Sequence, residues 1–357
     1  MDRRSFLGAC CAPALAPFTD GPAQKHPKPN PTAGQERRSV RVLRSVAAVP
    51  AEIVGSFRDP AAFAQAASGQ YFVFDRQGHA VYGIDAGLRG AWRLVQIGGE
   101  TGRILQPTAF GLAPDGRFVV ADRPGAAERV QLFAAGGSLL GGFTLPGRAP
   151  DTITLKGVVL NGAGSLHFDG RRLLMSQPET GALIAEYSLS GAVLRTFGNL
   201  RPTGQEADID VHLGLNSGIP LPAPDGGFFF VFRAGTPVFR RYDALGNFLF
   251  ERHVEGSELD SVINSLPNRW ERRRDKGQRL VPVIPPVVRA AAVDRAGRLW
   301  ISFVGPQHTY VYDGEGEKSR IVRFQAAGTI VPSSFFFSHT GRLLVTPGCY
   351  EFDPGTA

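Results

Sequence analysis

Hydrophobic and polar positions repeat in the same order six times along this chain. Each repeat has a short apolar run, a glycine-centred turn, a β-rich run, a polar turn and a second β-rich run. Glycine at such turns supplies the positive φ that a tight hairpin requires. The first turn of the six repeats contains, in order, Gly69, Gly116, Gly170, Gly226, Gly297 and Gly341. The pattern therefore predicts a succession of antiparallel hairpins.

The β-rich runs have the length of ordinary strands. A strand is expected after each glycine, at 71–74, 118–121, 173–175, 228–232, 299–303 and 343–345. A second strand comes next, as at 82–85, 130–133, 185–187, 241–243 and 310–313. The six glycines lie 47, 54, 56, 71 and 44 residues apart, which suits a four-stranded unit with loops of variable length. Radial repetition of such a unit gives a β-propeller, so we predict an all-β, six-bladed β-propeller over residues 39–357.

The last repeat reaches Ala357 after only three strands, which leaves its outer edge open. An open strand edge invites pairing with other chains. The β-rich segment near Val40 to Ala47 can remove that edge by pairing with it. We therefore expect an N-terminal strand to complete the last blade.

Composition and charge agree with one large folded domain. The chain has 357 residues, of which 43% are hydrophobic, enough for a substantial single core. Its net charge of +7 is uneven, since residues 1–44 hold eight basic and three acidic residues, a balance of +5. The remaining +2 does not favour nucleic-acid binding, which needs the charge on a folded face. No run is long and apolar enough to span a membrane, and we expect a monomer.

The first twenty residues resemble a targeting segment. The run from Arg3 to Gly8 is similar to a twin-arginine export motif, and a short apolar stretch follows from Ala9 to Phe18. Leu7 to Cys10 also resembles a lipoprotein cleavage box, and a disordered tail or a misplaced start codon is the alternative to both. We expect an export leader at 1–20, a disordered linker at 21–38 and a periplasmic or secreted protein.

Cysteine content does not decide the compartment. Cys10 and Cys11 lie in the expected leader, so Cys349 is the one cysteine of the expected mature domain. Such a domain would hold no internal disulfide and would depend on its core and on closure of the ring.

The second repeat carries a family resemblance. The runs from Ile97 to Arg103, Gly111 to Gly116, Val119 to Asp122 and Arg129 to Phe133 together resemble an NHL-type propeller repeat. The first and fifth repeats show weaker versions of the same pattern. The chain is thus similar to NHL-repeat and TolB-like propeller proteins over residues 40–357, and this resemblance implies the fold. It leaves the function open, because propellers of this kind include binding scaffolds, lactonases and lyases.

Propeller topology predicts which end of the ring carries chemistry. Four antiparallel strands a to d place the b–c and d–a connections at one end. His79 and His308 fall in b–c connections, and Asp75 and Asp122 end b strands. These four residues are candidates at the channel end, with ordinary turn positions as the alternative for the histidines.

The d–a connection before the fourth blade contains the sequence from Asp208 to His212. In an extended segment, Asp208, Asp210 and His212 would share one face. Two carboxylates and an imidazole could hold a divalent cation, the only cofactor that the sequence suggests. Lactonase-type propellers have a metal at this mouth, but their ligands cannot be matched here position by position. The alternative is a half-buried strand with its polar face toward solvent.

An insertion at 254–288 separates the fourth and fifth blades at the same end of the ring. Ser257 can cap a helix with apolar residues at helical spacing and with Pro267 after its end. The following segment combines Trp270 with Arg272, Arg273 and Arg274 and is the best candidate for a partner-binding patch. A solvated helix face, held by pairs with Glu271 and Asp275, is the alternative.

Two classes of function remain. The first is a non-catalytic exported propeller that binds a protein, peptide or glycan with this end of the ring. The second is a metal-dependent hydrolase or lactonase with its site at the channel mouth. The chain has no phosphate loop, Cys-x-x-Cys pair or serine-hydrolase elbow, and no complete catalytic set, so we favour the first.

Overall fold

The computed structural model describes residues 40–125, 127–145, 154–155, 158–159, 166–267, 269–274 and 279–356. The expected leader (1–20) and linker (21–38) lie outside the described residues. Residues Ser39–Ala357 form one compact unit.

Within the described residues, four antiparallel sheets each have four strands in sequence order. The first sheet has β2 (Pro60–Gln65), β3 (Tyr71–Asp75), β4 (Ala80–Ile84) and β5 (Ala91–Val95). The second has β6 (Pro107–Leu112), β7 (Phe118–Asp122), β8 (Arg129–Phe133) and β9 (Leu139–Thr144). The third has β12 (Leu166–Phe168), β13 (Arg172–Met175), β14 (Ala182–Ser188) and β15 (Val193–Asn199). The fourth has β16 (Gly218–Pro222), β17 (Phe228–Phe232), β18 (Val238–Tyr242) and β19 (Phe248–His253).

Nine further strands of the described residues form one larger sheet. Its members are β22 (Val288–Val293), β23 (Leu299–Phe303), β24 (Thr309–Tyr312), β25 (Lys318–Gln325), β26 (Thr329–Ile330), β27 (Ser334–Phe337), β28 (Leu343–Thr346), β29 (Tyr350–Phe352) and β1 (Val40–Ala48). The strand β1 joins its two halves. Residues Val40 to Arg44 pair in parallel with β25, and residues Ser45 to Ala48 pair antiparallel with β29.

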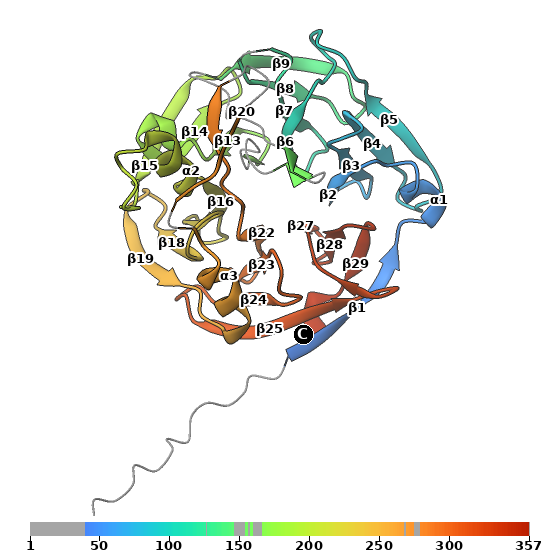
Figure 1. The fold of residues 1–357 in the computed structure, drawn as a ribbon. Helices are drawn as coiled ribbons and strands as arrows, with labels where there is room; N and C mark the ends of the chain where they lie inside the picture. The colour runs from blue at the N-terminus through green and yellow to red at the C-terminus, as the bar shows by residue number, and fades with distance from the viewer. Residues whose placement is uncertain are drawn as a thin grey trace, which may run out of the picture. The chain divides into compact units, whose positions relative to one another are not determined.

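The pairing of β1 with β29 agrees with the expected closing strand, whereas its pairing with β25 was not foreseen. The sheets give an all-β, propeller-like fold with few helices, as predicted. Figure 1 shows them arranged around a centre. The expected count of six blades depends on how the nine-stranded sheet is divided.

The predicted hairpin turns are also confirmed. All six turn glycines have φ between 77° and 94°, the left-handed region in which a Cβ is strained. The strands after these glycines begin and end within one residue of the predicted bounds.

The core lies between neighbouring sheets. One buried cluster joins Phe72 and Phe74 of the first sheet to Phe118 of the second, and Leu43 of β1 packs with Trp300 and Phe324. Contacts between innermost strands give the order β2, β6, β12, β16, β22 and β27, with β27 returning to β2. The first and fourth sheets are therefore opposite each other across the centre.

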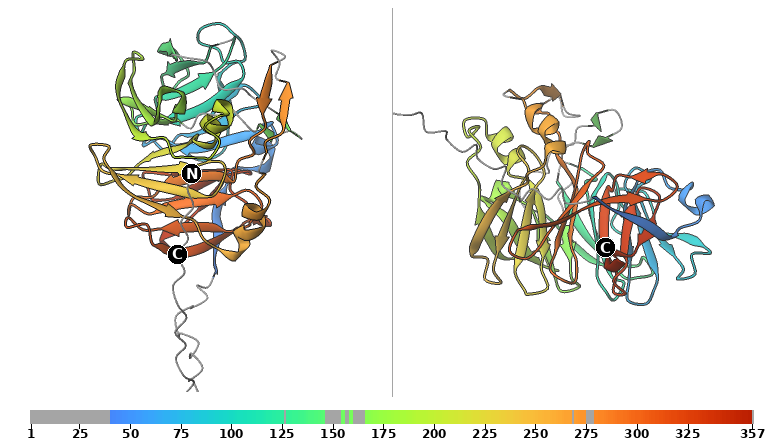
Figure 2. Two further views of the ribbon diagram at one scale, coloured as in Figure 1. Left: turned by 60° about the vertical axis from the view of Figure 1, so that its left-hand side comes forward. Right: turned by 90° about the horizontal axis from the view of Figure 1, so that it is seen from below.

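The long d–a connections gather at one end, which we call the insertion end (Figure 2). It carries α2 (Ile209–Leu215), η2 (Ser257–Leu259), α3 (Asp260–Asn264), β20 (Arg272–Arg274) and β21 (Leu280–Pro282). The pair β10 (Thr154–Leu155) and β11 (Val158–Val159) also belongs to a d–a connection. The remaining short elements are α1 (Ala51–Val54), η1 (Pro178–Thr180) and η3 (Pro354–Thr356). Among the described helices, none is long and apolar enough to cross a membrane.

Candidate functional site

The expected strand from Asp208 to His212 is wrong, because this segment begins the helix α2. Asp208 is the N-cap, and its Oδ1 accepts a hydrogen bond from the Val211 N–H at 3.4 Å. The local reason is the Asp followed by a helical pattern of apolar residues, since Val211 and Leu215 are the buried residues of the helix. At 3.6 residues per turn, Asp208, Asp210 and His212 do not share the common face that a strand would give them.

Arg272 forms ion pairs with the carboxylates of Asp208 and Asp210. Its Nη2 lies 2.6 Å from both Oδ1 and Oδ2 of Asp208, and its Nη1 lies 3.5 Å from Oδ2 of Asp210. The Arg272 guanidinium holds the pKa of Asp208 below its usual range, and Asp208 raises the pKa of Arg272. Two of the three candidate metal ligands and Arg272 of the candidate partner patch thus meet in one ion-pair network.

His212 belongs to a different set of contacts. Its Nδ1 lies 2.8 Å from the Thr203 hydroxyl oxygen and 3.8 Å from Oε1 of Glu206. Glu206 accepts backbone N–H groups of Thr203 and Gly204, which lowers its pKa. Among the described residues, no group of three metal-ligating side chains converges at one point.

The insertion is partly as predicted. The short helices η2 and α3 place Leu259 in the core beneath them, with Val262, Ile263 and Leu266 packed against it. The alternative of a solvated helix face does not hold where the segment is described, because Arg272–Arg274 form the strand β20, which pairs with β21. Residues 275–278 lie outside the described residues.

The aromatic and the basic side chains of this segment lie in different surroundings. Trp270 packs against Val211 and Ile284 and so anchors the hairpin on α2. Arg273 and Arg274 are exposed, and Arg273 Nε lies 2.9 Å from Oε1 of Glu271. The exposed part of the predicted patch is therefore basic and not aromatic.

The two channel-end aspartates, Asp75 and Asp122, are buried and accept hydrogen bonds from the neighbouring loops. Oxygens of Asp75 accept hydrogen bonds from the backbone N–H groups of Arg58, Asp59 and Gly78, each at 2.9 Å. Asp122 receives Arg129 Nε at 2.7 Å and the Leu105 N–H at 2.8 Å. Their contacts fix the b–c and d–a loops, and they leave little of either carboxylate for a ligand.

The two histidines occupy the b–c connections where the sequence placed them. His79 has φ 48° between β3 and β4, so it takes a turn conformation that few non-glycine residues adopt. His308 Nδ1 lies 3.8 Å from Oε1 of Glu258, which belongs to η2 of the insertion. His308 thus links the fifth repeat to the insertion.

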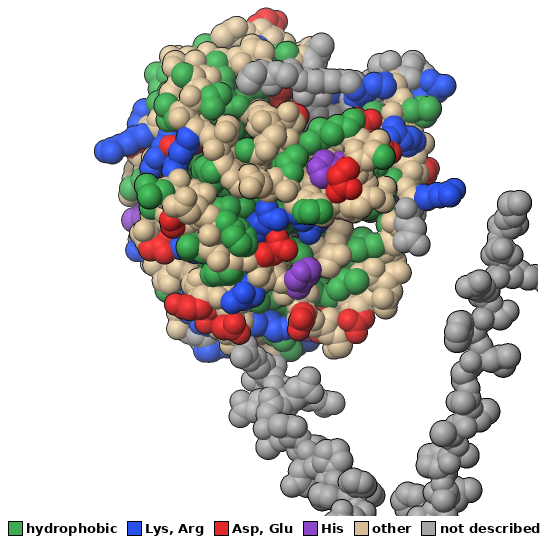
Figure 3. All heavy atoms as spheres, turned by 90° about the vertical axis from the view of Figure 1, so that its left-hand side faces the viewer, with side chains coloured by type: hydrophobic (Ala, Val, Ile, Leu, Met, Phe, Trp, Pro, Cys, Tyr) green, Lys and Arg blue, Asp and Glu red, His purple; other side chains and the backbone are tan. Residues whose placement is uncertain are grey.

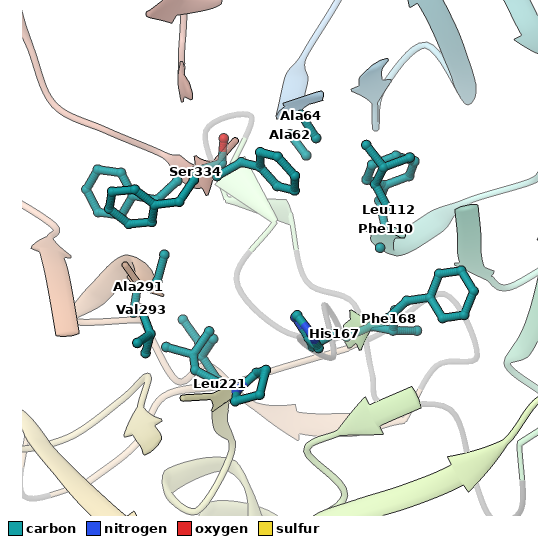
Figure 4. Close-up of a pocket in the computed structure, with 18 of the residues that line it drawn as sticks. Ala62, Ala64, Phe110, Leu112, His167, Phe168, Leu221, Ala291, Val293 and Ser334 are labelled. Atoms are coloured by element: carbon teal, nitrogen blue, oxygen red, sulfur yellow. The ribbon is translucent and has the colours of Figure 1, made fainter. Parts of the chain in front are cut away.

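The centre of the ring holds a cavity that sequence reasoning missed. Its volume is about 270 Å³, and the six innermost strands line it with mostly apolar side chains (Figure 4). Phe110, Leu112, Leu221 and Val293 are typical of the lining, and His167 and Ser334 are its polar side chains. Burial lowers the pKa of His167 to about 4, so this imidazole is neutral at pH 7.

A repeat-by-repeat alignment could have found His167. It stands two residues before the Asp169-Gly170 turn, on the inner strand of its repeat. Glu128 is a buried group that no sequence pattern singles out. Burial raises its pKa to about 7, and the Thr108 hydroxyl donates to its Oε1.

Comparisons with known proteins add structural neighbours and no family. No family model matches the chain, and no curated protein matches it. A streptogramin B lyase structure has 12% identity and a TM-score of 0.48, and the match covers 83% of this chain and 94% of that one. A hydrazine synthase of Kuenenia stuttgartiensis has 13% identity and a TM-score of 0.47, with coverage of 82% and 94%. A gluconolactonase, XC5397 from Xanthomonas campestris, has 16% identity and a TM-score of 0.46, with coverage of 81% and 84%.

Such low identities and scores say nothing about the activity of this chain. The lyase and the lactonase among these neighbours are β-propeller proteins. The propeller-like character of this chain itself rests on its own strand pairing.

Proposed function

We propose that this chain is a six-bladed propeller that works as a binding protein. Dividing the nine-stranded sheet at β1 gives β22–β25 as the fifth blade and β27, β28, β29 and the second half of β1 as the sixth. This division gives every blade four strands. It also supports the resemblance to NHL-repeat and TolB-like proteins.

The binding surface in this proposal is the insertion end, and its partner is an acidic protein, peptide or glycan. One observation carries the proposal: Arg272 contacts both oxygens of Asp208, so the charge of Asp208 is balanced within the protein. The neighbouring Arg273 and Arg274 remain exposed on a hairpin that Trp270 anchors. Such a basic segment suits an acidic partner, because opposite charges on the two sides of an interface attract each other.

The N-terminal pattern supports a periplasmic or secreted location for this binding protein. That part of the proposal rests on the twin-arginine-like sequence from Arg3 to Gly8 alone. A fusion of residues 1–38 to a reporter that is active only after export would test it. Reporter activity that is lost on Arg3→Lys/Arg4→Lys is the expected result, and activity unchanged by that substitution would contradict it.

Charge reversal tests the binding proposal. We expect a fluorescein-labelled oligoglutamate peptide to bind the full chain, with the affinity falling at least tenfold in Arg273→Glu/Arg274→Glu. The matched control is Arg171→Glu/Arg295→Glu, since these exposed arginines lie in turns at the other end of the ring. Equal losses in both double variants would show that only net charge matters and would contradict a site at the insertion end.

A metal-dependent hydrolase or lactonase stays the second candidate. The proximity of Asp210 and Asp208 to one another at the channel end favours it, since a cation could compete with Arg272 for them. Hydrolysis of an aromatic lactone that requires an added divalent cation, and that is lost in Asp210→Ala, would support this alternative over the binding proposal.

A further inference from the structure

Six residues of the innermost strands occupy equivalent positions around the central cavity. Each one pairs with the residue of the neighbouring strand that packs against the next unit of the ring. In β12 this residue is His167, whose partner Leu174 packs against the fourth sheet. All six line the cavity, and in chain order they are Ala64, Gly111, His167, Leu221, Ala292 and Phe336. The imidazole of His167 therefore belongs to a ring of positions whose other members have no polar side chain.

The fold does not require a histidine at this position, because the other five units have alanine, glycine, leucine or phenylalanine there. Within the described ranges, no hydrogen bond reaches the His167 imidazole, and burial lowers its pKa more than the charge of Asp169 raises it. A buried polar group without a partner destabilises a folded protein. A ligand in the cavity that supplies the hydrogen bond would remove this cost.

The second polar side chain of the lining already has a partner in the protein. The Ser334 hydroxyl oxygen lies 2.7 Å from the hydroxyl oxygen of Thr346. Figure 4 shows the His167 ring directed into the cavity from β12. His167 is therefore the side chain that can orient a ligand by a hydrogen bond.

The cavity wall favours an uncharged ligand. On the outer face shown in Figure 3, acidic and basic side chains are spread over the surface. Among the described residues that line the cavity, in contrast, none has a charged side chain at pH 7, since His167 is neutral there. An ion that entered would lose its hydration without gaining an opposite charge.

The volume and the lining set the size and shape of the ligand. The cavity has a volume of about 270 Å³. A water molecule takes about 30 Å³ in the liquid, so the cavity suits a ligand of up to roughly ten non-hydrogen atoms. Phenylalanine side chains of β6 and β27 are prominent in the wall, and such a wall suits a single aromatic ring.

We propose that the cavity binds a small neutral molecule with one aromatic ring and one hydroxyl group, and that His167 makes the hydrogen bond that orients it. A neutral imidazole has one nitrogen that donates and one that accepts, so it can accept the hydrogen of a phenol-type hydroxyl. The remaining surface of the ligand contacts the apolar wall. This site is separate from the basic hairpin of the proposed function and does not depend on it.

Three probes of similar shape test the chemistry of the ligand. A hydroxyl group of p-cresol replaces a methyl group of p-xylene, and p-toluate has a carboxylate at the same place. In calorimetric titrations of the full chain we expect p-cresol and p-xylene to bind and p-toluate to bind at least about tenfold more weakly than p-cresol.

Four variants test the role of His167. His167→Leu should weaken p-cresol binding about tenfold and change p-xylene binding less than about twofold, because only the hydroxyl loses a hydrogen bond. Ser334→Ala is the matched control and should leave the p-cresol affinity within about twofold, since its hydroxyl already pairs with Thr346. Ala291→Phe, which adds a ring to the cavity wall, should abolish the binding of both probes. Should His167→Leu prove unfolded by circular dichroism, His167→Phe replaces it with the same expected loss, because Phe336 occupies the equivalent position of β27.

The proposal fails if p-cresol does not bind, if p-toluate binds as tightly as p-cresol, or if the His167 variant weakens p-cresol and p-xylene equally. A loss of p-cresol affinity in Ser334→Ala as large as in the His167 variant would also overturn it. Oligoglutamate binding distinguishes this site from the hairpin. We expect the His167 variant to bind oligoglutamate as the wild type does, and a parallel loss of both ligands would contradict two separate sites.

Discussion

Asp208 and Arg272 lie 64 positions apart in the sequence and form an ion pair in which one guanidinium nitrogen contacts both carboxylate oxygens at 2.6 Å. Asp208 also caps α2, so the same carboxylate fixes the start of the helix and the position of the hairpin β20–β21. This pair connects two d–a insertions of the ring and gives the insertion end a defined shape.

The ion pair predicts a measurable coupling in stability. Asp208→Asn keeps a side-chain cap for α2 and removes the charge, whereas Asp208→Ala also removes the cap. We expect Asp208→Ala to cost about 1 kcal/mol more than Asp208→Asn in urea unfolding. A double-mutant cycle of Asp208→Asn with Arg272→Gln should give a coupling of about 0.5–1 kcal/mol, since the pair is largely exposed. A coupling of zero would mean that the contact does not hold the insertions together.

Gly111 predicts a second effect on stability. A Cβ at this position would lie 2.7 Å from Leu166 Cδ2 and 2.9 Å from Phe168 Cβ, so β6 and β12 could not approach as they do. Gly111→Ala should therefore destabilise the protein by about 1–3 kcal/mol. Gly141→Ala is the control, because a Cβ there meets no atom within 4 Å. Equal unfolding midpoints for the two variants would contradict the packing described between the second and third sheets.

Two titratable groups with shifted pKa values predict opposing effects of pH. Burial is the main cause of the raised pKa of Glu128, about 7, with Glu179 and Asp122 adding to it and Thr108 and Arg123 opposing it. The ordinary value is 4.5, so the folded state binds a proton that the unfolded state releases. Glu128 therefore removes stability as pH rises from 4.5 to 7, by up to about 3 kcal/mol.

His167 acts in the opposite direction. Its pKa in the folded state is about 4 against an ordinary 6.5, because burial disfavours the charged imidazole more than Asp169 favours it. Its contribution to the stability of the folded state is present above pH 6.5 and is lost as pH falls toward 4. We expect Glu128→Gln to lose stability as pH falls from 6.5 to 4.5, and His167→Asn to gain stability over the same range, both relative to the wild type. Urea unfolding at several pH values measures this, and curves parallel to the wild type in both variants would contradict it.

The strand β1 predicts that residues 39–48 are needed for the ring. Leu43 is buried with Trp300 and Phe324, so Leu43→Ala should cost about 2–5 kcal/mol. Deleting residues 1–48 should leave the edges of β25 and β29 unpaired and cause aggregation, detectable by light scattering. Deleting only 1–38 is the control and should leave the chain as stable as the wild type. Equal behaviour of the two deletions would show that β1 does not close the ring.

Local patterns predicted the strands and turns well, because glycine turns and β-rich apolar runs are short-range signals. The site was harder to predict. Alternation between Asp208 and His212 fits a strand and a helix start equally well until the burial of Val211 and Leu215 is known. The contact of Asp208 with Arg272 depends on where two insertions meet, which no local pattern contains.

The residues around the centre of the ring could be predicted only in part from the sequence. Arg76, Arg123 and Arg233 each follow a predicted strand, so a comparison of the repeats could have paired them as equivalent positions. The position of His167 inside the cavity could not be predicted, because it depends on the closed ring.

The binding proposal requires that the acidic residues of α2 belong to an ion pair and not to a metal site. Elemental analysis of the full chain, purified without chelator, measures this beside Asp208→Ala/His212→Ala and the control Asp260→Ala. We expect less than 0.1 equivalent of any divalent cation in all three proteins. A stoichiometric cation in the wild type and in Asp260→Ala that is absent from Asp208→Ala/His212→Ala would contradict the binding proposal and favour the metal-dependent hydrolase.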